Sequence, residues 1–540
     1  MSGPGDESTQ GGNRVRKNSK VFRLLVPVAA LGLIAGACSD DDEGSETSAP
    51  ASTEAPASTE APASTEAPSG TDAPATTAAG EVTVPQACDP STGNLDATEG
   101  VNANKFAADV LCGISKPLAA TGEEVIIGVQ NPEGDPAGSF PEYSLAIKAA
   151  ADFINAELGG IGGDPSKGVA GRPIKIELCT MAITPADSQR CANELAGKKP
   201  YTVISSLNFF GNHFPIYAQA GVSVIVGTPI TVGDFTDAST FSIGAGGGCL
   251  GVHTGAIWAA TQPAPFLGKK RVAVPWADTP PGVVCYYDLE QKPLQVLKGE
   301  TPGTSKLAGS IPDLEYIKDG VPIKPATPDL TAQVTQVLGF NPEVIVFSGQ
   351  GADCWNLVDG LGKQGWTPEK IPMILTGSCV DFEKMAAAGD LAKGVYFVGS
   401  AGAALSNPDA ISNPVWKLEA KTYLGKAAQY GVSEADIQKG FATQGWSVLM
   451  TIWEQAKLST GGDPTKLDAA AFKAQMKATD NNHIYASVPF GCTAAAAPYV
   501  AVCNQAVSFQ QWDGSKLVTL IESYLATDLI AGTELQPGPS

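Results

Sequence analysis

The fold is decided by residues 124–179, which read EVIIGVQNPEGDPAGSFPEYSLAIKAAADFINAELGGIGGDPSKGVAGRPIKIELC. Residues 125–129 form a short apolar run of the kind that a buried parallel strand requires. Apolar residues then recur at helical spacing through residues 143–158, and a glycine-rich turn follows. The alternation at residues 174–178 predicts a second strand. The stretch therefore predicts one right-handed β–α–β unit, with the loop 130–141 at the ligand-binding edge of the sheet.

The alternation of strand and helix continues through the rest of the chain. Short apolar runs bounded by polar residues predict strands at residues 202–204, 223–226, 240–243, 271–274, 306–311, 343–347, 372–375 and 394–398. Helical periodicity appears between and after them, for example at residues 329–339 and 444–458, and β-like segments follow at residues 500–511 and 517–521. This order predicts an α/β protein with two layers of parallel sheet.

The amino terminus has the pattern of an export signal. Five basic residues within residues 14–23 precede an uncharged run, residues 24–37, which would rise about 21 Å as a helix, too little to span a bilayer. The run ends in IAGAC, and small residues before a single cysteine resemble the lipobox of bacterial lipoproteins. The resemblance implies that residues 1–37 are a lipoprotein signal peptide and that Cys38 becomes the acylated amino terminus. The alternative is an ordinary cleaved signal peptide.

Composition predicts an extended tether after this signal. Residues 38–87 contain three copies of APASTE and too few apolar side chains to form a core. We expect this lipid-anchored, disordered segment to hold a soluble body away from the membrane surface. Residues 88–121 are interpreted as a small amino-terminal extension, and residues 528–540 as a carboxyl-terminal tail.

Charge and cysteine content limit the function classes. The formal net charge of −21 argues against nucleic-acid binding, because phosphates would be repelled. The eleven cysteines include Cys38, so ten remain, and an even number in an exported chain favours disulfides over metal ligands. The sequence does not determine their connectivity. Neighbour pairing is the simplest hypothesis, and it gives Cys88–Cys112, Cys179–Cys191, Cys249–Cys285, Cys354–Cys379 and Cys492–Cys503.

Motifs for catalysis are weak or missing in the sequence. Residues 246–251 match G-x-G-x-x-G before a helix, but the acid expected some twenty residues further on is missing. The three histidines, His213, His253 and His483, are isolated in the sequence, and neither an HExxH nor a CxxC pattern occurs. His213 would either face a cleft or have a surface or capping role. We therefore predict that the protein is not an enzyme and has no metal or other cofactor.

Three stretches resemble the periplasmic binding proteins of the leucine/isoleucine/valine-binding type. They are the opening β–α–β unit, PDLTAQVTQVLGFNPEVIVFSGQGAD at residues 328–353 and GVYFVGSA at residues 394–401. The resemblance covers roughly residues 123–526 in order. It implies the type I fold, in which two Rossmann-like lobes with parallel sheets are joined by three hinge crossings. Mapping those crossings gives lobe 1 as residues 122–264 and 399–484, and lobe 2 as residues 265–398 and 485–527.

The family's binding loops give a set of candidate ligand contacts in lobe 1. In branched-chain amino-acid binders, hydroxyl and backbone N–H groups of this lobe hold the solute's carboxylate, and Thr231 stands where a carboxylate-binding threonine is expected. Phe209 and Phe210 could supply an apolar wall. For each hydroxyl the alternative is local loop capping. The candidates in lobe 1 are Ser139, Phe140, Ser205, Ser206, Asn208, Thr228 and Thr231.

Lobe 2 departs from the family's pattern. The matching candidates there are Thr279, Gln350, Asp353 and Ser378. Amino-acid binders place an acid in the loop after a strand to meet the ammonium group, but the loop at residues 376–379 reads TGSC. A free α-amino acid therefore fits poorly. A disulfide between Cys354 and Cys379 would tie two loops of the cleft together.

The sequence thus predicts an extracytoplasmic solute-binding lipoprotein, held on the outer face of the cell membrane by its lipid. The solute would be small and polar: amino-acid-like, an amide or a small organic acid. Its partners would be the permease subunits of an ABC importer, and a monomer is expected. The alternative is a sensing or adhesion receptor of the same fold, and a hydrolase on this scaffold is a third hypothesis.

Membrane attachment tests the interpretation of Cys38. We expect Cys38→Ala to move the protein from the membrane fraction to the soluble fraction, because the residue that would be acylated is gone. Fractionation of the expressing cells, followed by immunoblotting, measures this. The neighbouring change Ser39→Ala should leave the protein with the membranes, and a Cys38→Ala protein that stays there would contradict the lipoprotein interpretation.

Overall fold

The computed structural model describes residues 103–244, 248–301, 304–399, 408–411, 414–485, 489–495 and 498–533. All of them belong to one compact unit, Glu81–Ser540. The predicted signal peptide and tether, with Cys38 and Cys88, lie outside the described residues. Among the described helices, none is both long and apolar enough to cross a membrane.

The opening stretch forms the predicted β–α–β unit, and three more strands extend it to a parallel sheet of five. Val125 pairs with Ile174 on one side of the first strand, and Val129 pairs with Ile204 on its other side. The strand order is β2-β1-β3-β4-β5. The strands are β1 (Val125–Pro132), β2 (Ile174–Met181), β3 (Thr202–Ser205), β4 (Val224–Val226) and β5 (Thr240–Ser242).

A second sheet of seven strands follows, in the order β14-β13-β12-β11-β10-β6-β8. Its strands β8, β6, β10, β11 and β12 run parallel, whereas β13 and β14 pair antiparallel at one edge. A separate parallel pair, β7 (Pro275–Ala277) and β9 (Val321–Ile323), lies beside it. The strands of the large sheet are β6 (Arg271–Ala273), β8 (Glu315–Tyr316), β10 (Val344–Phe347), β11 (Met373–Thr376), β12 (Tyr396–Gly399), β13 (Val507–Trp512) and β14 (Leu517–Tyr524).

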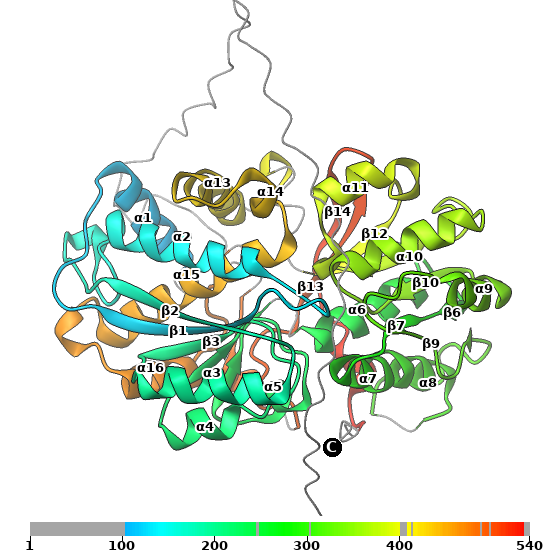
Figure 1. Ribbon diagram of the computed structural model, residues 1–540, viewed down its shortest axis with the longest axis horizontal. Helices are drawn as coiled ribbons and strands as arrows, with labels where there is room; N and C mark the ends of the chain where they lie inside the picture. The colour runs from blue at the N-terminus through cyan, green and yellow to red at the C-terminus, as the bar shows by residue number, and fades with distance from the viewer. Residues whose placement is uncertain are drawn as a thin grey trace, which may run out of the picture. The chain divides into compact units, whose positions relative to one another are not determined.

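Helices cover both faces of each sheet, and Figure 1 shows the two groups of elements side by side. Helices are needed on both faces because successive residues of a strand point to opposite sides of the sheet. For example, the neighbours Val203 and Ile204 belong to different apolar clusters. The helices are α1 (Ala103–Ser115), α2 (Pro141–Ala156), α3 (Pro185–Gly197), α4 (Phe214–Gln219), α5 (Val232–Thr236), α6 (Cys249–Thr261), α7 (Pro280–Tyr286), α8 (Lys292–Lys298), α9 (Thr331–Gly339), α10 (Ala352–Lys363), α11 (Phe382–Ala388), α13 (Pro414–Gln429), α14 (Glu434–Ile437), α15 (Gly440–Thr460) and α16 (Ala469–Lys477).

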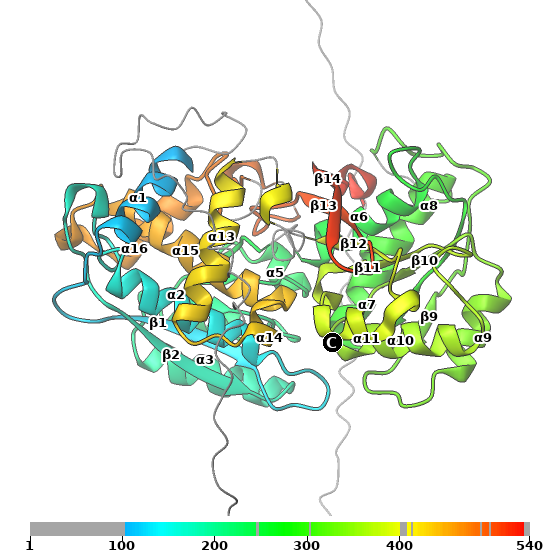
Figure 2. The same ribbon diagram turned by 90° about the horizontal axis from the view of Figure 1, so that it is seen from above.

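The chain passes three times between the two sheets. It leaves β5 for α6, returns from β12 to α13, and leaves the first sheet again before β13. After the second passage, α15 packs along α2 of the first lobe, as the two views of Figures 1 and 2 agree. The α/β fold with two lobes and three crossings is therefore confirmed. α6 itself packs on β10, β11 and β12 of the larger sheet, although the predicted boundary at residue 264 places it in lobe 1.

One predicted strand is wrong. Residues 306–311 form turns instead, and the strand at this edge is β8. Gly309 has φ +70°, and its N–H donates to the carbonyl of Val296. The side chains of Leu307 and Ile311 pack on the core of the larger sheet. These apolar residues therefore hold a turn against α8 and do not form a strand.

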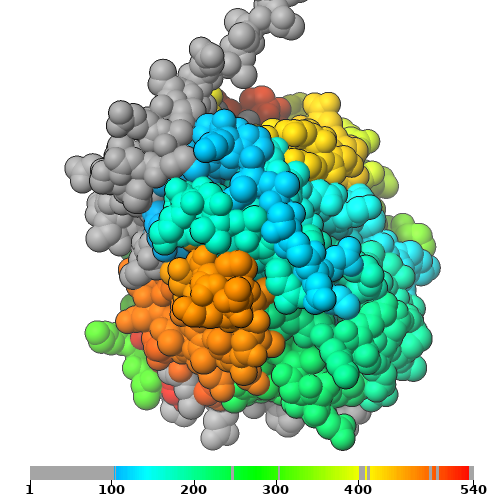
Figure 3. Space-filling view, turned by 90° about the vertical axis from the view of Figure 1, so that its left-hand side faces the viewer, coloured from blue at the N-terminus to red at the C-terminus, as the bar shows by residue number. Residues whose placement is uncertain are grey.

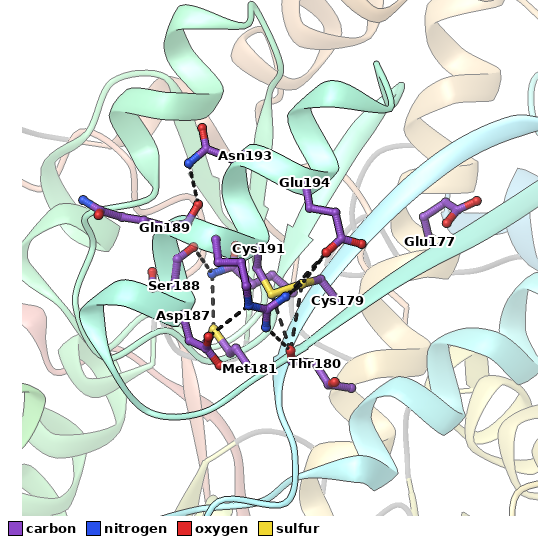
Figure 4. Close-up of polar contacts among 12 residues, drawn as sticks. Glu177, Cys179, Thr180, Met181, Asp187, Ser188, Gln189, Cys191, Asn193 and Glu194 are labelled. Atoms are coloured by element: carbon purple, nitrogen blue, oxygen red, sulfur yellow. Dashed lines mark hydrogen bonds and ion pairs between the residues drawn. A yellow bond between two sulfur atoms is a disulfide. The ribbon is translucent and has the colours of Figure 1, made fainter.

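Four of the five predicted disulfides are confirmed: Cys179–Cys191, Cys249–Cys285, Cys354–Cys379 and Cys492–Cys503. Cys88 lies outside the described residues, so its pairing with Cys112 stays a prediction. Figure 4 shows the first bridge joining β2 to α3, with the carbonyl of Thr180 and the carboxylate of Glu194 beside it. Arg190 donates hydrogen bonds to both groups, at 2.8 and 3.4 Å.

A buried lysine ties the amino-terminal helix to the first lobe. Lys457 on α15 is 1% exposed and forms ion pairs with Asp109 on α1 and with Asp164, the latter at 2.8 Å. Burial raises the pKa of Asp109. Asp164 is also buried, but hydrogen bonds from Lys457, Ser166 and Lys167 hold its pKa below the usual range. Figure 3 looks onto this lobe, with the blue start of the described chain above and the orange helices near the carboxyl end below.

Removing the charge of Lys457 should lower the stability of the first lobe. Lys457→Met leaves two buried carboxyl groups without their shared partner, and we expect a loss of about 3–5 kcal/mol in the free energy of unfolding. Urea unfolding followed by circular dichroism measures it. The control is Lys466→Met, whose exposed pair with Asp463 contributes about 0–1 kcal/mol. Equal unfolding midpoints for the two variants would contradict a supporting role for Lys457.

Candidate functional site

The candidate site is a cavity of about 960 Å³, counted with the space that opens to solvent, and both lobes line it. Its walls are mainly the loops that follow strands β3, β4, β7, β10 and β11, together with the first turns of α6 and α15. This is the edge at which ligands of parallel sheets bind, because the carboxyl ends of all the strands meet there.

The wall from lobe 1 combines two aromatic rings with neutral polar groups. Phe441 begins α15 and packs edge-on against Phe140, with the ring centres 4.9 Å apart. Thr228, in the loop after β4, donates from its hydroxyl to Oε1 of Gln444 at 2.7 Å. Phe209 adds the second ring. This wall therefore offers apolar faces and hydrogen-bonding groups without charge.

The wall from lobe 2 is braced by hydrogen bonds and a disulfide. The hydroxyls of Thr376 and Ser378 both donate to the carbonyl of Gly349, at 2.8 and 3.2 Å, which joins the loops after β10 and β11. The bridge Cys354–Cys379 links the same two segments, as the sequence predicted. Thr279 caps α7 by accepting from the N–H of Gly282 at 3.1 Å. These loops form a preorganised wall.

One ionisable side chain lies in this otherwise neutral lining. His253, on α6, reaches Oε1 of Glu290 at 3.1 Å and Oγ of Ser348 at 2.6 Å, both through Nδ1. Burial raises the pKa of Glu290, and the neighbouring His253 opposes that rise. Serine and carboxylate share one ring nitrogen here, whereas a catalytic triad places them on opposite nitrogens. The arrangement therefore holds a histidine in place and does not activate the serine.

Two groups of side chains have the residue types of metal ligands. In the first, the sulfurs of Cys249 and Cys285 are joined to each other beside His253, so they are not thiolate ligands. In the second, Glu419 and Glu454 lie on different ring nitrogens of His483, at 2.8 and 3.0 Å. Although burial opposes it, the two carboxylates raise the pKa of His483 well above its usual value. That group is a buried ion triad, because the imidazole separates the two acids.

The structure brings four of the eleven predicted ligand contacts into this cavity. They are Thr228, Thr279, Gln350 and Ser378. Phe140 stands behind Phe441, one side chain away from the cavity.

Three other candidates form contacts within the loops around the cavity instead. Ser139 is exposed and accepts from the N–H of Gly134 at 2.8 Å. Asp353 accepts from the N–H of Ala326 at 3.1 Å. Thr231 is the N-cap of α5, where it forms a capping box with Asp234.

The remaining three candidates form a hydrogen-bond network inside lobe 1. Ser205 contacts Nε2 of His213 at 3.1 Å, and Ser206 donates to the carbonyl of Gln130 at 2.9 Å. Asn208 donates to the hydroxyl of Ser188 at 2.8 Å. His213 is fully buried, and burial lowers its pKa to about 3. It lies inside lobe 1, neither on the surface nor in the lining of the cavity.

Several cavity residues were missed from the sequence. Phe441, Thr443 and Gln444 lie in the first turn of α15, and their signal was the polar residues at the start of this otherwise apolar helix. His253 was interpreted as isolated, because its partners Glu290 and Ser348 are 37 and 95 residues away.

Asp234 holds the loop that carries Thr228 and Ile230. Its carboxylate accepts from the N–H groups of Ile230 and Thr231 at 2.9 and 2.8 Å, and its other oxygen has no hydrogen-bond partner. Burial raises the pKa of Asp234 to about 7 despite these bonds. This loop also lies close to α6: Gly248 has φ +58°, and a Cβ there would lie 1.9 Å from the carbonyl oxygen of Pro229.

Comparison with solved structures shows the class: the fold is that of the type I periplasmic binding proteins. An ABC-transporter solute-binding protein from Rhodopseudomonas palustris, solved with 4-hydroxybenzoate, matches 75% of this chain and 97% of its own at 17% identity and a TM-score of 0.54. The leucine-binding protein LivK of Thermotoga maritima matches 73% and 97% at 13% identity and 0.53. LivJ of Streptococcus pneumoniae, solved with isoleucine, matches 74% and 100% at 15% identity and 0.54. At these identities the likeness establishes the fold.

A sequence-family comparison agrees with this class. Residues 306–516 match the model of a family described as "Periplasmic binding protein". A comparison with curated proteins finds no match. The resemblance noted in the sequence is therefore confirmed. Some of the similar structures are described as solute- or substrate-binding proteins of ABC transporters, and the matched family is described as periplasmic.

Stability should respond to pH through Asp234. Because its pKa is raised, Asp234 keeps a proton in the folded state at pH values where the unfolded state has lost it. The resulting stabilisation is complete below about pH 4 and is lost as the pH rises to about 7. Asp234→Asn removes this dependence. We therefore expect the variant to gain about 1.4 kcal/mol per pH unit over wild type between about pH 5 and pH 7.

Urea unfolding at several pH values measures this difference. The change Asp390→Asn, at an exposed aspartate of lobe 2, is the matched control. A difference between Asp234→Asn and wild type that is constant across this range would contradict the burial of a protonated Asp234.

Proposed function

We propose that this protein captures a small polar solute between its two lobes outside the cytoplasm and delivers it to an ABC importer. The observation that carries the proposal is the cavity itself, because loops at the carboxyl ends of both sheets line it from opposite sides. A solute in that position contacts both lobes at once. It therefore stabilises the closed arrangement over an open one, which is how binding is signalled to a partner.

The lining favours a small organic acid or amide over a free amino acid. The rings of Phe209 and Phe441 supply apolar surface, and hydroxyl and amide groups such as Thr228 and Gln350 supply hydrogen bonds. None of the described lining residues is Asp or Glu, so an ammonium group would find no anion. The relative from Rhodopseudomonas palustris solved with 4-hydroxybenzoate supports an acid with an apolar body as the solute.

The anchoring and the domain limits belong to the same proposal. A lipid on Cys38 and the tether of residues 38–87 would keep a monomeric receptor near the permease. Lobe 1 would comprise the first sheet with the return segment up to residue 484, and lobe 2 would comprise the second sheet. The packing of α6 supports a start for lobe 2 at Cys249 instead of residue 265.

A thermal-shift screen of small acids, amides and amino acids tests the function. A solute present at about 100 times its dissociation constant should add about 2.7 kcal/mol to the stability of the folded protein. Phe441→Ala should weaken binding of that solute by about tenfold or more, because it removes one apolar wall. Isothermal titration calorimetry measures the affinity.

The control for Phe441→Ala is Leu520→Ala, since Leu520 is exposed on β14. Binding that is equally strong in both variants would place the solute elsewhere. A screen in which none of these compounds shifts the unfolding temperature would contradict the proposed function.

A further inference from the structure

His253 presents one free nitrogen to the cavity. Its side chain is 10% exposed, and Nδ1 is occupied by Glu290 and Ser348. Nε2 makes no hydrogen bond with the described residues, and it is not among their fully buried, unpartnered polar atoms. Because His253 lines the cavity, Nε2 is the atom that a solute can reach.

We propose that Nε2–H of His253 binds the carboxylate of the solute, with Glu290 as the positioning residue behind it. The solute is then an apolar monocarboxylic acid without an amino group. This inference rests on the proposed function and narrows its solute class. It also gives this chain a specificity-determining residue on α6, at the start of the second lobe, where sequence reasoning assigned none.

The pair of His253 and Glu290 can carry the required proton. Glu290 is completely buried, and its Oε2 has no partner. Without solute, the proton stays on the carboxyl group and is donated to Nδ1, so Nε2 carries the hydrogen of the neutral ring. When a carboxylate arrives at Nε2, the proton moves from Glu290 to Nδ1. An imidazolium ion then lies between two carboxylates, and both of its N–H groups donate charge-assisted hydrogen bonds.

The remaining lining explains the selectivity. Apart from His253, the described lining residues have neutral side chains. An amino acid would therefore bury its ammonium group without an anion, which costs far more than a neutral hydrogen-bonding group. A primary amide fits the same space but does not attract the proton of Glu290 to His253. The acid gains the charge-assisted bond that the amide lacks.

Other ionisable groups around α6 leave this pair isolated. Asp288 is paired with Lys292, and Asp528 accepts from Ser305 at 3.2 Å. Tyr286 donates to the carbonyl of Lys318 at 3.0 Å. Of the ionisable side chains on the described elements packed against α6, Glu290 is the one within hydrogen-bond distance of His253; the others are Tyr286, Tyr287, Asp288, Lys292, Lys298, Tyr396 and Asp528.

Matched probes separate the solute classes. Isocaproate is leucine without its amino group, and benzoate is a rigid apolar acid; each is compared with its primary amide and with leucine by isothermal titration calorimetry. We expect the wild-type protein to bind an acid at least about tenfold more tightly than its amide and leucine. The affinity for the acid should fall as the pH rises and the pair loses its proton, because the charge-assisted bond is then lost.

Two histidine variants separate the two ring nitrogens. His253→Asn keeps an amide near the position of Nδ1 and removes the donor at Nε2, so acid binding should weaken by about tenfold to a hundredfold. His253→Gln keeps a neutral donor near Nε2, so it should retain part of the affinity and lose the pH dependence. Glu290→Gln should shift the pH profile towards lower pH, and Glu300→Gln, on the surface of the same lobe, is its control.

The outcomes distinguish this inference from the function on which it rests. If an amide or leucine binds as tightly as the acid, or if the pH profile is the same in wild type and His253→Gln, the role of His253 is overturned while solute capture stands. If neither acids, amides nor amino acids bind, both are overturned. Unfolding midpoints near that of wild type show that the variants are folded.

Discussion

The geometry of parallel strands is the constraint on which the site depends. Every strand of a parallel sheet ends at the same edge, so the loops that follow the strands gather there whatever their order in the chain. Two such sheets line one cavity here, with residues as distant as Thr228 and Ser378 in its walls. The third contribution comes from α15, which returns to the first lobe and places Phe441 beside Phe140.

The neutral lining makes the few charged groups decisive. A cavity walled by aromatic rings, hydroxyls and a disulfide gives little compensation for a buried charge, so a charged solute depends on each partner it meets. Buried charges inside lobe 1 are likewise paired: Lys457 and His483 each lie between two carboxylates. Both ions are thus paired inside lobe 1, and among the described residues the pair of His253 and Glu290 is the one at the cavity.

The fold could be predicted from the sequence because each β–α unit has a local pattern, a short apolar run followed by apolar residues at helical spacing. Sequence reasoning chose Thr279 and Ser378 from loops that follow strands, and both residues line the cavity. It could not tell which hydroxyls of a loop point inward: Ser206 follows a strand as well, but it donates to the backbone of Gln130. The role of His253 depends on partners brought together by tertiary packing, so neither spacing nor motif reveals it.

The disulfides show how the lobes can move without disturbing their walls. Cys249–Cys285 joins the start of α6 to α7, and Cys354–Cys379 joins two neighbouring loops of the same lobe. Both bridges lie within one lobe, so the wall of lobe 2 moves as a unit. Cys249 immediately follows the first passage between the lobes. His253, one turn further along α6, is therefore held with Glu290 and Ser348 in the wall of lobe 2.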